Sequence, residues 1–503
     1  MISVAAILET AYERFARYPA LRDGDHTRTY AELGDRAHRF ADALRELGVR
    51  PGDRVALIAS NSAAYVEASH ALFVGGFVRV ALSAKLHPDE IAQILGDCAP
   101  AAVVVSADWA ARLPETGAHR VVFGDGFEDL IARGRPTRPP RTPGPDDLAA
   151  LLYTSGTTGL PKGATLTHAN WAAMMRNSMV ELPTIGTDDV ILHVAPLSHF
   201  SGYVEPTCSA RGATHIVHET FDPATVVEAI ERERVTVLPV VPTMLNMMLP
   251  EAEAGGHDFS SLRTILYGGS GIAPDRLARA VRVFGDVFVQ FFGLSETPMP
   301  LTALSQRDHR FDPGGAAPSR LASAGRPNPF VELRVDAPAG EVGEILVRGD
   351  TVMAGYWGKP EQTAEMLDGD GWAATGDLGR LDGDGYLYIV DRKRDMIVTG
   401  GYNVYPAEIE NAISVLREVQ EVAVVGVPDE RWGEAVKAVV VLRPGAQLTA
   451  ADIVAACTER LASYKKPRSV EFVDDLPKTG SGKLMRRKVR DRYWAGRERS
   501  VGG

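Results

Sequence analysis

Residues 153–163 read Tyr-Thr-Ser-Gly-Thr-Thr-Gly-Leu-Pro-Lys-Gly and extend an apolar run that begins at Leu148. The glycines let backbone amides turn toward an anion, and the hydroxyl and ammonium groups beside them are donors suited to phosphate oxygens. The order differs from a Walker loop, which needs a four-residue gap followed by Gly-Lys-Ser/Thr. The segment predicts a phosphate-binding loop after a strand. Its candidate ligands are Thr154, Ser155, Gly156, Thr157, Thr158, Gly159 and Lys162.

On both sides of this loop, short β-branched apolar runs alternate with amphipathic stretches. The runs lie at 55–59, 102–106, 148–153, 190–194, 235–241, 264–267 and 287–292. Helix candidates lie between them, and two of these start at Asp222-Pro223 and Ala273-Pro274, where a proline suits the first helical turn. The alternation predicts an α/β fold with largely parallel sheets.

After about residue 330 the pattern changes to hairpin-like pieces. The run 343–349 is followed by the turn sequence 381–385, which leads into another apolar run at 386–390 and is typical of antiparallel strands. We therefore expect a large N-terminal domain over 1–393, made of parallel-rich α/β sheets with a β-barrel-like subdomain. A small α+β domain is expected over 394–503.

The composition is that of a globular protein with ample material for a core. The chain has 503 residues, 45% of them hydrophobic, and its net charge of −11 gives no reason to expect nucleic acid or an anionic membrane as a partner. The three cysteines fit neither a disulfide framework nor a zinc site. The start lacks the charged-then-apolar order of a secretory signal, and no apolar run reaches the 18 or so residues of a membrane span. We expect a cytoplasmic protein.

The glycine-rich loop, continuing into Leu166-Thr167-His168-Ala169-Asn170, resembles the signature loop of the adenylate-forming superfamily. That superfamily includes AMP-forming acyl-CoA synthetases, aryl-CoA ligases, luciferases and adenylation domains. Further signatures follow in the family's order through residue 488, so the resemblance spans almost the whole chain. It implies activation of a carboxylic acid by ATP as an acyl-adenylate, followed by transfer of the acyl group to the thiol of CoA. The implied cofactors are ATP, Mg²⁺ and CoA.

A carboxylate follows the apolar run that ends at Phe292, in Phe291-Phe292-Gly293-Leu294-Ser295-Glu296-Thr297. A carboxylate beside a triphosphate would be repelled unless a divalent cation lay between them, and Mg²⁺ prefers oxygen ligands, so Glu296 is the predicted metal ligand. The family usually has Tyr and Thr where Phe292 and Ser295 stand. By resemblance, the nucleotide would also contact Gly268, Gly269, Ser270, Phe292, Gly293 and Ser295.

Two further motifs complete the predicted nucleotide site. By resemblance, Asp377 in Thr-Gly-Asp would accept hydrogen bonds from the ribose hydroxyls, and Arg392 would be a second ribose contact. Near the C terminus, 477–483 reads Pro-Lys-Thr-Gly-Ser-Gly-Lys and places Lys483 on a flexible loop. A lysine that reaches the α-phosphate offsets the charge that grows during attack on phosphorus. The catalytic candidates are Thr154, His199, Glu296 and Lys483.

The segment Pro196-Leu197-Ser198-His199-Phe200-Ser201-Gly202 resembles the family's acid-pocket motif. By resemblance, His199 would lie near the substrate carboxylate. Adenylation domains for α-amino acids usually place an aspartate after the aromatic residue, and Ser201 cannot pair with an ammonium in that way. The predicted pocket is mainly apolar, which favours a hydrophobic aliphatic, aryl or polycyclic acid. Its candidates are His199, Phe200, Tyr203, Leu294, Thr297 and Met299.

Transfer to a thiol needs a second arrangement of the site, because Lys483 would occupy the route of the incoming thiol. The family rotates its small domain about one hinge residue, which corresponds to Arg394 here. Rotation would bring Gly400, Gly401 and Tyr402 to the site as a thiol channel. Three alternatives stay open: transfer to a carrier-protein phosphopantetheine, a luciferase-like oxidation, and an inactive nucleotide-binding relative. The oligomeric state is also open, and a homodimer is one option.

Overall fold

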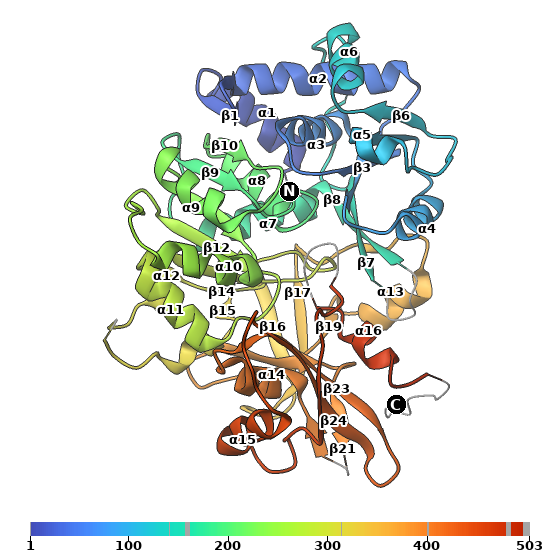
Figure 1. Cartoon of the computed structure of the whole chain (residues 1–503). Helices are drawn as coiled ribbons and strands as arrows, with labels where there is room; N and C mark the ends of the chain where they lie inside the picture. The colour runs from blue at the N-terminus through green and yellow to red at the C-terminus, as the bar shows by residue number, and fades with distance from the viewer. Residues whose placement is uncertain are drawn as a thin grey trace. The chain divides into compact units, whose positions relative to one another are not determined.

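The computed structural model describes residues 2–139, 141–155, 161–312, 314–399, 402–478 and 484–495. Two compact units make up the chain, and both combine helices with sheets (Figure 1). The first unit comprises Met1–Gly271, Ala278–Leu333 and Val347–Ala373, and the second comprises Ile272–Leu277, Arg334–Leu346 and Ala374–Gly503. The domain boundary expected between 393 and 394 stays a prediction.

A nine-stranded sheet of the first unit has the order β15-β14-β13-β12-β11-β9-β10-β1-β2. Its inner pairs, from β13 through β12, β11, β9 and β10 to β1, are parallel, and the outermost pairs are antiparallel. The strands are β1 (Pro19–Asp23), β2 (His26–Thr29), β9 (Val190–His193), β10 (Thr214–Val217), β11 (Val237–Val240), β12 (Thr264–Gly268), β13 (Phe288–Phe292), β14 (Thr302–Leu304) and β15 (Arg326–Pro327).

A seven-stranded sheet of the same unit has the order β18-β8-β7-β4-β3-β5-β6. The pairs from β7 to β6 are parallel, whereas β7 with β8 and β8 with β18 are antiparallel. The strands are β3 (Arg54–Ala59), β4 (Val78–Ser83), β5 (Ala102–Val105), β6 (His119–Val122), β7 (Leu148–Ser155), β8 (Pro161–Thr167) and β18 (Gly355–Tyr356). Because their pairs are largely parallel, the two sheets confirm the predicted α/β class.

Helices connect these strands, and several begin at residues whose side chains satisfy the free amides of the first turn. Thr29 and Glu32 form a capping box on α2, Thr167 and Asn170 form one on α7, and Asp222 caps α9. The helices are α1 (Val4–Arg14), α2 (Tyr30–Glu46), α3 (Ala63–Gly75), α4 (Pro88–Cys98), α5 (Ala107–Ala110), α6 (Asp125–Arg133), α7 (His168–Glu181), α8 (Phe200–Ser209), α9 (Pro223–Arg232), α10 (Pro242–Glu253), α11 (Pro274–Phe284), α12 (Gln306–His309), the 3₁₀ helix η1 (Ser319–Ala322) and α13 (Pro360–Met366).

The later part of the chain forms two smaller sheets. A four-stranded sheet has the order β16-β17-β19-β20, and a second sheet has the order β22-β21-β24-β23 with β25 beside β24. The strands are β16 (Val331–Asp336), β17 (Gly343–Gly349), β19 (Ala373–Leu381), β20 (Leu387–Arg392), β21 (Ile397–Thr399), β22 (Tyr402–Val404), β23 (Val419–Asp429), β24 (Gly433–Leu442) and β25 (Ser469–Phe472). The helices here are α14 (Pro406–Ser414), α15 (Ala450–Arg460) and α16 (Arg486–Asp491).

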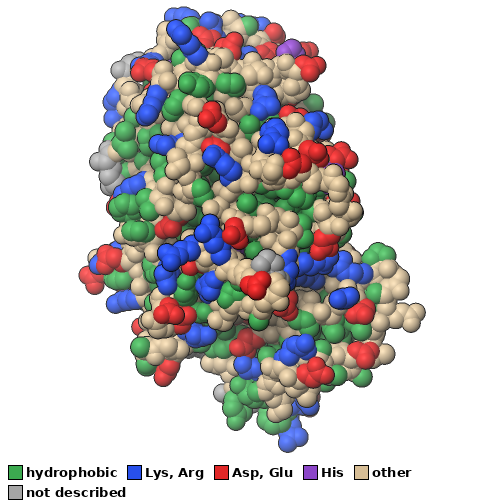
Figure 2. Space-filling model, turned by 90° about the vertical axis from the view of Figure 1, so that its left-hand side faces the viewer, with side chains coloured by type: hydrophobic (Ala, Val, Ile, Leu, Met, Phe, Trp, Pro, Cys, Tyr) green, Lys and Arg blue, Asp and Glu red, His purple; other side chains and the backbone are tan. Residues whose placement is uncertain are grey.

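The surface carries both signs of charge. Basic and acidic side chains are interspersed over most of the face drawn in Figure 2. Among the described residues, every helix is too short or too polar to cross a membrane. All three cysteines, Cys98, Cys208 and Cys457, are buried and free.

Candidate functional site

The predicted phosphate loop joins two antiparallel strands. β7 ends at Ser155, β8 begins at Pro161, and Thr154 lies opposite Lys162 in their register. A Cβ added to Gly163 would lie 3.0 Å from Cζ of Tyr153, so the close approach of the strand to this ring favours glycine. The candidates Gly156, Thr157, Thr158 and Gly159, and the side chain of Ser155, lie outside the described residues.

The ring of Tyr153 is fixed beside the loop by an acidic residue of α4. Its hydroxyl donates to Oδ2 of Asp97 at 2.6 Å, and Lys359 forms an ion pair with the same carboxylate. Burial, with the carboxylate as the next cause, raises the pKa of the Tyr153 phenol, which therefore stays neutral and donates. Two segments distant in the sequence, those of Asp97 and Lys359, thus support the strand that enters the loop.

Glu296 lies near Thr154, as a shared role at the phosphates would require. The Thr154 hydroxyl donates to Oε1 of Glu296 at 3.3 Å, and the Tyr356 hydroxyl donates to the same oxygen at 2.9 Å. The Glu296 carbonyl also accepts the N–H of Met353 at 2.9 Å, which ties this segment to the chain before β18. Burial and then Glu296 raise the pKa of Tyr356 far above its ordinary value.

Lys162 is 7% exposed, and its ammonium lies 5.2 Å from the centroid of the Tyr356 ring. The ring face attracts a cation at this distance. One cluster at the ends of the two strands that flank the loop therefore contains Thr154, Lys162, Glu296 and Tyr356. Tyr356 could not be predicted from the sequence, because its only local signal is Gly355-Tyr356-Trp357, and the pairing of β18 with β8 is a tertiary feature.

A magnesium ion bound with nucleotide usually has one or two protein carboxylates, with water and phosphate oxygens as its other ligands. In the described part of the chain, no three His, Cys, Asp or Glu residues are grouped as a metal site would require. Glu296, which accepts hydrogen bonds from two hydroxyls, fits a site with a single protein carboxylate. Its role as metal ligand stays a prediction.

Close packing requires glycine at two of the predicted nucleotide contacts, Gly268 and Gly293. A Cβ on Gly268, at the end of β12, would lie 2.4 Å from the Phe291 carbonyl oxygen and 3.0 Å from Cε2 of Phe200. Gly269 has a φ of +84°, and Ser270 beside it is exposed. A Cβ on Gly293 would lie 2.6 Å from the backbone of Met299. Phe292 and Ser295, on either side of that turn, are half-buried.

The two predicted ribose contacts meet in the second unit. Asp377 of β19 lies opposite Arg392 of β20, and Nε of Arg392 is 2.6 Å from Oδ1 of Asp377. Gly376 has a φ of +72°, which only glycine adopts readily, and its N–H donates to Glu344 at 3.2 Å. The Arg392 side chain is 40% exposed whereas that of Asp377 is 4% exposed, so a partner from solvent reaches the arginine more easily.

The predicted acid-pocket residues come from α8 and from the turn after β13. His199 immediately precedes α8, and its ring centroid lies 6.1 Å from that of Tyr203. Phe200, Tyr203, Thr297 and Met299 are buried, and the Leu294 N–H donates to the Thr297 carbonyl at 3.0 Å. Burial raises the pKa of Tyr203 to about 12. The lining proposed from sequence is therefore mostly buried and aromatic or apolar.

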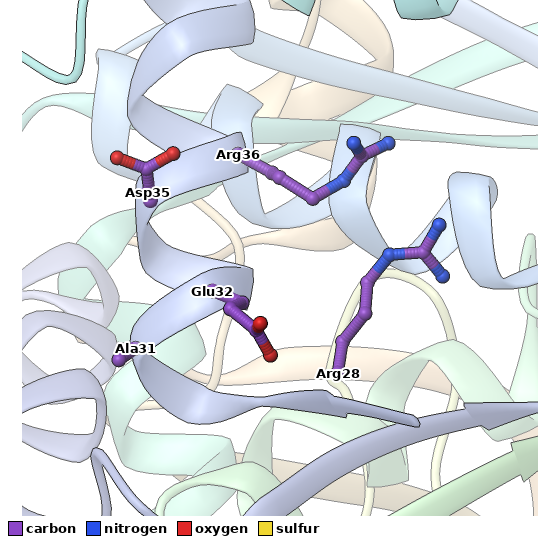
Figure 3. A pocket seen from close by; sticks show the side chains of 5 residues that line it. All are labelled: Arg28, Ala31, Glu32, Asp35 and Arg36. Carbon is purple, nitrogen blue, oxygen red and sulfur yellow. The ribbon is translucent and has the colours of Figure 1, made fainter. Parts of the chain in front are cut away.

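A separate hollow of about 560 Å³ lies along α2 (Figure 3). It is lined by Arg28, Ala31, Glu32, Asp35 and Arg36. The two arginines each pair with the buried carboxylate of Glu67, at 3.0 and 2.8 Å. These ion pairs account for the charges of the two arginines, and none of the predicted site residues lines the hollow.

Only some of the residues predicted to act in the thiol-transfer arrangement lie in the described part of the chain. Gly400, Gly401 and Lys483 lie outside the described residues. Tyr402 begins β22, is 57% exposed and stacks on Tyr464 with ring centroids 4.8 Å apart. Arg394 lies in the turn after β20, where the Arg392 carbonyl accepts the N–H groups of Asp395 and Met396.

Comparison with known proteins matches two family models. The model of the AMP-binding enzyme matches residues 8–357, and that of the AMP-binding enzyme C-terminal domain matches residues 408–483. The chain is 41% identical to a feruloyl-CoA synthase from an Amycolatopsis species, over 94% of this chain and 96% of that protein. It is 38% identical to the fatty acid–[acyl-carrier-protein] ligase ScoC of Streptomyces coeruleorubidus, over 96% and 95%. The crystal structure of the anthranilate CoA ligase AuaEII with anthranoyl-AMP superimposes with a TM-score of 0.88, at 29% identity over 98% of this chain and 97% of that one.

Proposed function

The chain belongs to the AMP-binding enzyme family and is an adenylate-forming acid:CoA ligase, and we propose that the acid it activates is hydrophobic and carries an aromatic ring. The observation that carries this proposal is the burial of Phe200, Tyr203 and Met299 at the predicted pocket. Aromatic walls contribute area and offset stacking to a flat ring. Ser201 offers no charge that would pair with an ammonium group.

In the first half-reaction, a carboxylate oxygen of the acid attacks the α-phosphorus of ATP. A bond from that oxygen to phosphorus forms, the bond between the α-phosphorus and its bridging oxygen breaks, and pyrophosphate leaves. We assign the binding of the phosphates to Thr154, Lys162 and the glycine-rich loop, and the stabilisation of the growing charge to Lys483. Bound Mg²⁺ would neutralise phosphate charge beside Glu296. Asp377 and Arg392 are assigned to the ribose.

In the second half-reaction, the thiol sulfur of CoA attacks the acyl carbon and AMP leaves with the electron pair of the broken bond. The proton of the thiol passes to solvent or to a nearby base. We propose that rotation about Arg394 removes Lys483 and brings Gly400, Gly401 and Tyr402 to the thiol route. The small domain would then begin at 394. The buried, unpaired cysteines support a reducing cytoplasmic setting.

A carrier-protein phosphopantetheine is the second candidate acceptor. The similarity to a fatty acid–[acyl-carrier-protein] ligase over 96% of this chain supports a carrier protein as the alternative acceptor. The chemistry of the thiol is the same in both cases, so the site residues do not distinguish them.

A screen for pyrophosphate release over acids of graded size tests the substrate class. We expect release with arylpropenoic, arylacetic or benzoic acids to exceed that with acetate by about 100-fold or more in kcat/KM, since each buried methylene-sized group contributes about 1 kcal/mol. Equal or greater turnover of acetate would contradict the proposal. Adding CoA, or a holo carrier protein in its place, identifies the acceptor through the thioester that forms.

A further inference from the structure

Arg79, in the middle of the seven-stranded sheet, is a cation with no carboxylate partner in the described part of the chain. Its side chain is 1% exposed. Nε donates to the Ser69 hydroxyl at 2.8 Å, and Nη2 donates to the Leu197 carbonyl at 2.9 Å. Nη1 is buried and makes no hydrogen bond to any described residue. One arm of this guanidinium is therefore left without a partner.

Three aromatic rings surround the guanidinium but do not replace an anion. Its carbon lies 5.8 Å from the ring of Trp171, 5.9 Å from that of Tyr65 and 6.0 Å from that of Phe73. These distances are at the outer limit of cation–π attraction, so the rings offset only part of the cost of burying a charge. A methionine or leucine at this position would avoid that cost. Stability therefore does not explain why the chain has a buried arginine here.

The position of Arg79 connects it with the predicted acid pocket. The carbonyl that it binds belongs to Leu197, two residues before His199. A Cβ added to Gly202 in the first turn of α8 would lie 3.2 Å from Nη2 of Arg79. Trp171, one of the three rings, lies 5.9 Å from the ring of Tyr203. The guanidinium thus lies directly behind the start of α8, on the side that carries Tyr203.

Other polar atoms near Arg79 also lack partners. The Tyr65 hydroxyl, the Trp171 indole N–H and the Ser201 hydroxyl are buried and make no hydrogen bond within the described residues. Buried polar groups are nearly always hydrogen-bonded, and a group of unpaired ones beside a predicted pocket indicates a missing polar partner. The two hydroxyls can donate or accept, whereas the indole and the guanidinium can only donate, so an acceptor oxygen is the partner that these N–H groups lack.

We propose that Arg79 is a specificity-determining residue whose Nη1 binds an acceptor oxygen of the acid, at the end remote from the reacting carboxylate. This inference rests on the proposed function and deepens it: the substrate is an aromatic acid with a hydroxyl, methoxy or keto oxygen on its distal part. The reacting carboxylate is not the partner, because an ion pair with arginine would lower its nucleophilicity and hold it behind α8. It must instead reach phosphate at the Thr154 and Glu296 side.

Matched pairs of acids test this assignment. We compare cinnamate with 4-hydroxycinnamate and benzoate with 4-hydroxybenzoate, measuring kcat/KM for pyrophosphate release with the full chain. The wild type is expected to favour at least one oxygenated acid by about 10-fold or more, as a hydrogen bond to a charged group contributes. Arg79→Met, which keeps the volume but not the donor, is expected to lose most of that preference while still turning over the plain acid. Equal ratios in both proteins would overturn the proposal.

A second variant and the wild-type ratio of activities keep the test decisive if Arg79→Met does not fold. Arg79→Lys restores a donor and is expected to recover part of the preference, whereas a purely structural role would show equal losses with both acids of a pair. The wild-type ratio is itself a test, since no preference for either oxygenated acid would overturn the assignment. Absence of pyrophosphate release with every acid would contradict the proposed function instead, so the two failures are distinguishable.

Discussion

Arg486 and Asp391 are joined by an ion pair in which Nη1 lies 3.2 Å from Oδ1. The same guanidinium lies 3.7 Å from Asp395 and pairs with Glu410 through Nε at 2.8 Å. Burial raises the pKa of Asp391 to about 6, with Arg486 acting in the opposite direction. Arg486 therefore connects the beginning of α16, three residues after Lys483, to both sides of the turn that contains Arg394.

Replacing Arg486 with methionine should weaken this turn and the position of Lys483 together. Three carboxylates would lose their shared cation, and breaking a buried ion pair in this way costs about 3–5 kcal/mol. We expect a lower midpoint in urea unfolding and slower adenylation. Arg487→Met is the matched control, because Arg487 is 48% exposed and pairs with Asp491 on the same helix. Equal midpoints for the two variants would contradict the structural role of Arg486.

The hydrogen bond from Tyr356 to Glu296 predicts a graded pair of variants. Glu296→Gln removes the charge proposed to face Mg²⁺, so pyrophosphate release should fall by about 100-fold and need a higher Mg²⁺ concentration. Tyr356→Phe removes one donor to the carboxylate and should cost about 5- to 10-fold. Tyr18→Phe, at a side chain that is 46% exposed, should match the wild type. An unchanged Mg²⁺ dependence in Glu296→Gln would count against the metal role.

Buried neutral histidines should make the protein unstable in mild acid. Burial lowers the pKa of His193 to about 3 and those of His168, His215 and His309 to about 4. Below about pH 6.5 the unfolded chain takes up protons that the folded chain excludes, so stability falls as pH falls toward these values. Each imidazole contributes about 1.4 kcal/mol per pH unit in that window.

His168→Leu tests that pH dependence without removing a hydrogen bond, because neither ring nitrogen of His168 has a partner among the described residues. The variant should lose less stability than the wild type between pH 6.5 and 5. Urea unfolding at each pH measures the difference. His119→Gln, at an exposed position, serves as control. Parallel curves for wild type and His168→Leu would show that His168 does not titrate in this way.

A proline at the proposed hinge should separate the two half-reactions. Arg394→Pro restricts φ and removes an N–H, which stiffens the turn between β20 and β21. Thioester formation from supplied acyl-AMP should fall more than adenylation, in single-turnover assays of each step. Lys393→Pro tests the neighbouring position, whose N–H bonds to the Gly376 carbonyl at 2.9 Å, and should instead lower stability. Equal losses in both steps for Arg394→Pro would contradict the hinge assignment.

The sequence predicted the α/β class well because its signals are local. The apolar runs around β3, β5, β9, β12 and β13 are long enough to identify strands, and prolines located the starts of α9 and α11. Within the site, the order of residues in the loop and around Glu296 was informative without any knowledge of contacts. The hydrogen bond between Thr154 and Glu296 depends on how the fold places the ends of β7 and β13.

Other features depend on contacts that no local pattern encodes. Tyr356 reaches Glu296 because the two-residue strand β18 pairs with β8, and so short a strand has no periodicity of its own. Arg486 lies in the basic sequence Arg-Arg-Lys at 486–488, and its three carboxylate partners are 76 to 95 residues away in the chain. Arg79 sits in an apolar strand, where only the fold reveals which atoms lack partners.

Acid-dependent exchange of labelled pyrophosphate into ATP, compared between the wild type and Lys483→Ala, is the most direct test of the proposed adenylation. Exchange reports adenylation alone because it needs no thiol. Lys488→Ala, an exposed position on α16, is the matched control. We predict exchange with an aromatic acid in the wild type and the control, and a loss of about 100-fold or more in Lys483→Ala while thioester formation from supplied acyl-AMP persists. No exchange with any acid in the wild type, or exchange near the wild-type rate in Lys483→Ala, would contradict this prediction.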